Sequence, residues 1–149
     1  MDSDKVVATL NGLIETVKDG EFGFKTAAEG LQDPQVKSLF QQYSRQRSDM
    51  ARELQSEVRR LGGDPEKSGS TAGAAHRGWI NIKSVVTGKS DSSIIAEAER
   101  GEDSAKRMYE EALREPLPSA TLALVREQSM KIHDAHDRVR ALERATSVR

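Results

Sequence analysis

The sequence predicts an all-α protein: a four-helix bundle built from two antiparallel hairpins, which are joined by a long crossover carrying a short helix. Charged residues make up 32% of the chain and aromatic residues only 4%, as is typical of helical proteins with charged surfaces. Four long stretches carry apolar residues at spacings of three and four, which is the helical period. We expect residues 1–149 to form a single domain.

The first two helices are expected over residues 4–31 and 33–61. Each carries one apolar stripe. The second opens with Asp33 as its N-cap and Pro34 at the first helical position, where the missing N–H costs nothing. It is expected to end at the glycine pair of residues 62–63.

The second pair of helices is expected over residues 91–115 and 119–145, separated by the sequence "EPLPSA". The crossover, residues 62–90, is rich in Gly and Ser at first and then carries a short helical pattern. Trp79 is expected to anchor the crossover to the bundle, and His76 to pack or cap within it.

The lengths of the connections predict the topology. The short links within each pair require antiparallel neighbours. The crossover is long enough to climb a helix of about 40 Å and start the third helix parallel to the second. Two hairpins joined in this way form a ferritin-like arrangement. An up-down-up-down bundle with an excursion after the second helix is the alternative.

Several polar residues fall on the otherwise apolar stripes. At 100° per position, this predicted core polar cluster consists of Glu21, Arg47, Glu102, Gln128 and His136. A buried Arg47 needs carboxylate partners, and Glu21 and Glu102 are the natural candidates. The alternative is a wider stripe, with these groups reaching the rim. Asp19 falls off the stripe, and so does His133, which is expected at the edge or in solvent.

The spacing argues against a di-iron centre. Such a centre takes a Glu from each of two helices and Glu-x-x-His from each of the other two. The second helix instead presents "RSDM" from Arg47, whose guanidinium has no lone pair to give. The hypothesis is therefore no metal and no cofactor. The alternative is one iron or manganese ion held by Glu21, Glu102, His133 and His136.

Composition narrows the function classes. The chain has no cysteine and a net charge of −1, which excludes thiolate chemistry and gives no general attraction to nucleic acid. It shows no signal peptide, no membrane span, no phosphate-binding loop and no catalytic triad. We expect a soluble cytoplasmic protein that binds neither nucleic acid nor membrane, and whose partner is a second copy or another protein.

Four stretches carry a resemblance to a known family: "LNGLIETVKDGEFGFKTAAE", "LGGDPEKSGSTAGAAHRGWINIKS", "ERGEDSAKRMYEEAL" and "AHDRVRAL". Together they resemble the bacterial ferritin-like four-helix-bundle family classed only as a domain of unknown function, of the 2383 type. The resemblance implies the ferritin-like fold but no reaction. The interpretation is a non-enzymatic bacterial protein acting through protein binding or self-assembly, with a link to stress physiology by analogy. A ferritin-like metal-binding protein or di-metal oxidoreductase with a degenerate site is the alternative.

Overall fold

The computed structural model describes residues 3–65, 78–79, 81–88 and 90–147. Within them lie four long helices and one short one, and no strand. The helices are α1 (Ser3–Gly30), α2 (Pro34–Arg60), α3 (Ile82–Thr87), α4 (Asp91–Ala112) and α5 (Ser119–Ser147). None of these helices is long and apolar enough to cross a lipid bilayer.

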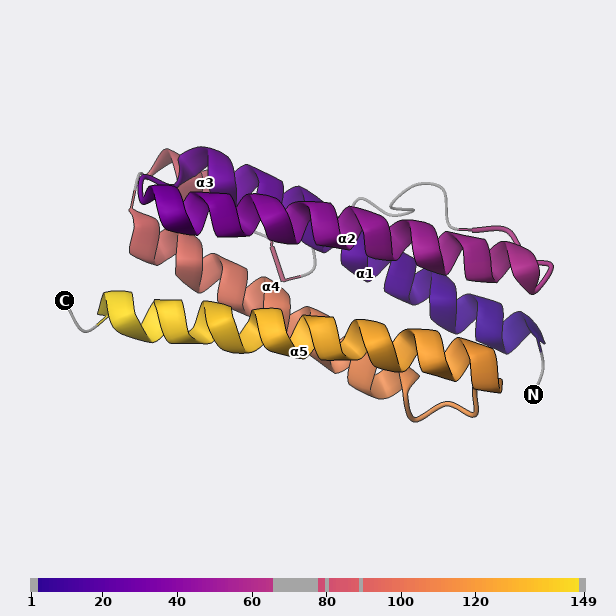
Figure 1. Cartoon of the computed structure of the whole chain (residues 1–149). Coiled ribbons are helices and arrows are strands. Elements are labelled where there is room, and N and C mark those ends of the chain that lie inside the picture. Colours follow the sequence, from indigo (N-terminus) through magenta and orange to yellow (C-terminus); the bar gives the residue numbers. More distant parts are fainter. Residues whose placement is uncertain (1–2, 66–77, 80, 89, 148–149) are drawn as a thin grey trace.

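The helices run in the directions that the connection lengths predict. Figure 1 shows α1 and α2 antiparallel, α4 and α5 antiparallel, and α2 parallel to α4. The end of α2 and the start of α4 therefore lie at opposite ends of the bundle. This confirms the fold of two hairpins joined by a crossover with a short helix, and it excludes the up-down-up-down alternative. The start of α1 and the end of α5 lie at opposite ends of the bundle (Figure 1).

Polar groups tie the first hairpin to the second at one end of the bundle. The Asp33 side chain accepts hydrogen bonds from the backbone N–H groups of Gln35 and Val36, and so caps α2 as expected. The Asp91 carboxylate, in the first turn of α4, accepts from the N–H groups of Gln32 and Asp33. The turn between α1 and α2 is thus held by the N-cap of α2 and by hydrogen bonds to the first turn of α4.

The apolar core has two halves. One half gathers the early residues of α1 with the later residues of α2 and α4: Val6, Leu10, Leu13, Ile14, Val17, Met50, Leu54, Val58 and Tyr109 are among its members. The other half gathers the opposite ends of the same helices: Phe24, Ala27, Ala28, Phe40, Ile94, Ile95 and Ala98 are among its members. Four residues of the predicted polar cluster lie in sequence between the two halves, one on each long helix: Glu21, Arg47, Glu102 and His136. Gln128 lies between Val125 and Ile132, within the half that contains Met50.

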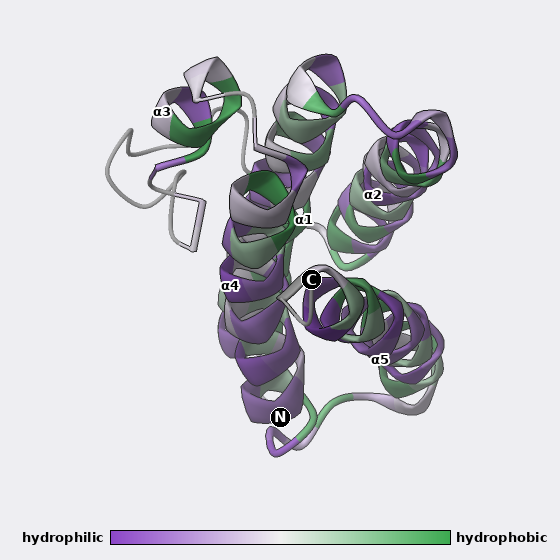
Figure 2. Cartoon of the chain, turned by 90° about the vertical axis from the view of Figure 1, so that its left-hand side faces the viewer, coloured by the Kyte–Doolittle hydropathy of each residue, from purple (hydrophilic) through white to green (hydrophobic). Residues whose placement is uncertain are grey.

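Trp79 anchors the crossover, as predicted. Its side chain is buried and its ring lies 4.9 Å from that of Phe24, centroid to centroid. It fits there because Gly23 and Gly101 face it, and a Cβ at either position would come within 2.2 Å of the indole. After Trp79 the chain forms α3, which lies beside α1 and α4 (Figure 2). The expectation for His76 falls outside the described residues.

Candidate functional site: a polar layer across the middle of the bundle

The centre of the bundle holds a buried ion pair between α2 and α4. Arg47 Nη1 donates to Glu102 Oε1 at 2.6 Å, and Arg47 Nη2 donates to Glu102 Oε2 at 2.7 Å. Both side chains have 0% exposure. This is the bidentate fork geometry, in which two parallel N–H···O bonds join a guanidinium and a carboxylate. The pair lies between the two apolar halves of the core.

The surroundings of Arg47 keep it charged. Burial, the largest single influence, lowers its pKa, but the charge and hydrogen bonds of Glu102, together with smaller contributions from Tyr109 and Tyr43, raise the pKa, and the net shift is upward. The guanidinium also lies over the Phe24 ring, 5.2 Å from its centroid. Gly20 makes room for it, since a Cβ there would come 2.9 Å from Arg47 Nη1. Arg47 Nε has no hydrogen-bond partner within the described residues.

Glu21 does not join this pair. Its side chain is only half-buried, and among the described residues no hydrogen bond or ion pair links it to Arg47. The backbone carbonyl of Glu21 accepts from the Ser44 hydroxyl instead. On α1 the guanidinium instead meets Gly20, one position earlier, and the Phe24 ring. Two acids were expected to bind Arg47. Instead, the Glu102 carboxylate alone accepts from both terminal nitrogens of the guanidinium.

A second buried network surrounds Gln128 on α5. Tyr109 donates to Gln128 Oε1 at 2.7 Å, and Gln128 Nε2 donates to the Met50 carbonyl at 3.1 Å and to Glu53 Oε1 at 2.9 Å. Burial raises the pKa of Tyr109, so its hydroxyl stays protonated and donates. These bonds join three helices within the apolar half of the core that contains Met50.

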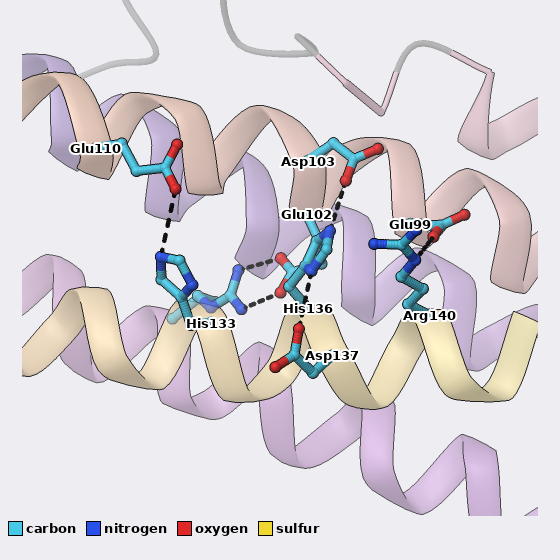
Figure 3. Close-up of polar contacts among 9 residues, drawn as sticks. Glu99, Glu102, Asp103, Glu110, His133, His136, Asp137 and Arg140 are labelled. Atoms are coloured by element: carbon cyan, nitrogen blue, oxygen red, sulfur yellow. Dashed lines mark hydrogen bonds and ion pairs between the residues drawn. The ribbon is translucent and has the colours of Figure 1, made fainter.

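The two histidines of α5 point in different directions. His136 is buried, and its Nε2 lies 2.6 Å from Asp103 Oδ1 on α4, while its Nδ1 lies 3.4 Å from Asp137 Oδ1. His133 is half-exposed, and its Nε2 lies 3.7 Å from Glu110 Oε2. Figure 3 shows the two rings reaching separate carboxylates along α4. This is the divergence that a spacing of three residues produces on a helix.

Two buried acids were not predicted. Asp19 was expected off the stripe, yet it is 7% exposed. Glu97 on α4 is also buried; it accepts from the N–H of Asn81 at 2.7 Å and from the Arg100 guanidinium. Glu97 thereby holds the start of α3. A single apolar stripe per helix cannot reveal Glu97, because α3 packs beside a further face of α4.

The fold and this polar layer define a ferritin-like helical bundle with an ion pair at its centre. A solved structure of a Dps1 mutant from Mycobacterium smegmatis is similar to 95% of this chain over 96% of its own length, with a TM-score of 0.76 and 13% identity. At that identity the likeness shows the fold alone. The model of the family described as Domain of unknown function (DUF2383) matches residues 5–115, and the chain belongs to that family. No curated protein matches the chain.

The residues present do not fit the di-metal centre that the ferritin-like fold can carry. Within the described part of the chain, no three His, Asp or Glu side chains converge so that they could hold a metal ion. Glu102 is already bound through both oxygens by Arg47. A cation placed there would meet a permanent positive charge. His133 and His136 each face a separate carboxylate rather than a shared point.

Proposed function

We propose that this chain is a non-enzymatic bacterial protein of the cytoplasm that acts through protein binding or self-assembly. The observation that supports this proposal most is the ion pair at the bundle centre. Arg47 places a permanent positive charge in the bundle core, the region in which di-iron bundles hold their metal ions. With its interior closed by this pair, such a bundle acts through its surface.

The role in stress physiology rests on analogy with the ferritin-like fold alone. What supports action through the surface is the charged exterior of a chain that is 32% charged yet has a net charge of −1. Such a balance favours neither nucleic acid nor anionic lipid as a partner. We therefore propose that the partner is a protein, which includes a second copy of this chain.

Metal analysis of protein purified without chelator tests this proposal. We expect iron and manganese well below one ion per chain, both in the wild type and in His136→Ala. Stoichiometric iron or manganese that is lost in His136→Ala would favour the rival function of metal binding. Glu102→Gln serves as a second probe, because it would remove a ligand in the rival set but only a charge in the ion pair.

A separate measurement addresses nucleic acid as a partner. Electrostatic association with duplex DNA is strongest at low salt, so binding is measured there. We expect no binding at micromolar protein, and tight binding there would remove the proposed restriction to protein partners.

A further inference from the structure

One large apolar side chain of the described residues is strongly exposed. Met130, near the middle of α5, has 68% of its surface accessible, and no other large hydrophobic residue in the described ranges is classed as exposed. Single exposed apolar residues are common, so exposure alone assigns nothing. Met130, however, borders a groove of about 420 Å³ between α5 and Leu113 at the end of α4.

Charged residues flank Met130 symmetrically. Arg126 lies four positions before it and Asp134 four positions after it, so the three side chains follow one ridge of the helix. All three line the groove. Arg126 and Asp134 are exposed, and neither forms a hydrogen bond or ion pair within the described part of the chain. The ridge therefore presents one positive charge, one apolar centre and one negative charge.

This order of charges makes the ridge complementary to the same ridge on a second copy of the chain. When two copies of α5 pack antiparallel with a two-fold axis at Met130, residues at equal distances before and after Met130 face one another. Arg126 of each copy then meets Asp134 of the other, and the two Met130 side chains meet at the axis. An isologous contact of this kind uses the same surface on both copies. A parallel pairing would set like charges against each other at both positions.

The bundle leaves this ridge free. Within the chain, α5 packs on α4 and more lightly on α2, and it makes no comparable contact with α1 (Figure 2). Antiparallel copies centred on Met130 would overlap from Ser119 over about 23 residues, or about 34 Å of helix. One helix pair of that length gives an interface at the small end of the stable range.

We propose that two copies of this chain associate through α5, antiparallel, about a two-fold axis at Met130. This inference rests on self-assembly as proposed above and names its surface. Because the interface is small, we expect a dissociation constant of the order of micromolar.

Sedimentation equilibrium of the full chain tests this pairing with two charge reversals. Arg126→Asp and Asp134→Arg each place like charges together at both ends of the homodimer contact. We expect each variant alone to dissociate at least about tenfold more readily than the wild type. Mixed in equal amounts, the two variants face unlike charges at both ends, and we expect a heterodimer within about threefold of the wild-type affinity.

Two further variants separate the contact from the fold. Met130→Glu places two acids at the axis and should also weaken association at least about tenfold. Arg52→Asp reverses an exposed charge on α2, away from the ridge, and should leave association unchanged. All of these side chains are exposed, so circular dichroism and the midpoint of thermal unfolding should stay close to wild type.

The outcomes distinguish this inference from the broader proposal. Dimers that survive both charge reversals, or single variants that the mixture fails to rescue, would overturn the α5 contact while leaving self-assembly through another surface. A wild-type chain that stays monomeric at high concentration would also overturn it. Stoichiometric metal in the purified protein would instead remove the proposed function, whatever the state of association.

Discussion

The ion pair at the centre of the bundle and the ion pairs on its surface join the same kinds of side chain in different surroundings. Arg47 and Glu102 have no exposed surface, whereas Arg52 and Asp49 on α2 are 66% and 64% exposed. At the centre, no solvent can replace a lost partner, so an unpaired charge keeps its full desolvation cost. On the surface, water takes the place of a lost partner. The comparison teaches that burial, rather than the number of bonds, sets how far each charge depends on its partner.

The largest effect is expected from breaking the central pair. Glu102→Ala leaves the Arg47 guanidinium buried without its carboxylate. Removing one partner of a buried pair costs about 3–5 kcal/mol, so the free energy of unfolding should fall by about that much. Urea denaturation followed by circular dichroism measures the change.

The matched control replaces both partners at once. Arg47→Met combined with Glu102→Leu removes the unpaired charge and keeps an apolar side chain in each place. Such exchanges are often neutral or stabilising, so we expect the double variant to recover most of the stability lost in Glu102→Ala. A double variant as unstable as Glu102→Ala would show that the pair itself is needed, and the burial argument would fail.

The helical period predicted four of the polar residues that turn inward. Arg47, Glu102, Gln128 and His136 are all buried, as the 100° spacing along each helix predicts. Glu21 differs because helical position specifies a face and not a partner. Both terminal nitrogens of Arg47 bind the single carboxylate of Glu102, and on α1 the guanidinium meets Gly20 and the Phe24 ring.

One residue that the sequence did not reveal depends on the crossover. Glu97 is buried on a face of α4 that a two-hairpin model leaves in solvent. The Glu97 carboxylate accepts a hydrogen bond from the backbone N–H of Asn81, just before α3. A helical wheel shows one helix at a time and cannot predict a contact between two segments. Gly23 and Gly101 were the available signal, because two glycines inside helices indicate that something approaches closely. What approaches them is Trp79, and pattern alone did not place its ring between α1 and α4.

An intermediate effect is expected where one partner is buried and the other is not. Asp103 is half-exposed and contacts the buried His136 at 2.6 Å. Asp103→Ala removes that contact but leaves the ring edge near water, so the loss of unfolding free energy should be about 1 kcal/mol. Asp137→Ala is the control. The Asp137 carboxylate lies 3.4 Å from Nδ1 of the same histidine and is 79% exposed, so the free energy of unfolding should change by no more than about 0.5 kcal/mol. Equal losses in the two variants would contradict the dependence on burial.

A smaller effect with a pH signature is expected at Glu57. Hydrogen bonds from Arg60, and also from Thr121 on α5, lower the pKa of the Glu57 carboxyl, against the opposing effect of burial. A lowered pKa in the folded state stabilises the protein above the unfolded value of about 4.5, and this stabilisation is lost as the pH falls through the folded value.

Comparison of wild type with Glu57→Gln across pH measures this signature. We expect the wild type to be more stable at pH 7 by about 0.5–1 kcal/mol. The difference should shrink as the pH falls below about 4.5. A difference that stays constant between pH 7 and pH 3 would show that the charge of Glu57 has no part in it.

The smallest effect is expected at the exposed pair on α2. Asp49 accepts from Arg52, which also donates to the hydroxyl of Ser48, so Arg52 keeps a partner when the charge at residue 49 is lost. Asp49→Asn preserves shape and helix propensity and should change the free energy of unfolding by less than about 0.5 kcal/mol. Added salt should reduce even that difference, since exposed charges are screened. The same urea titrations measure it beside Asp103→Ala. If Asp49→Asn cost as much as Asp103→Ala, the burial of the group that each carboxylate binds would not set the cost, and the ranking from the centre of the bundle outward would lose its basis.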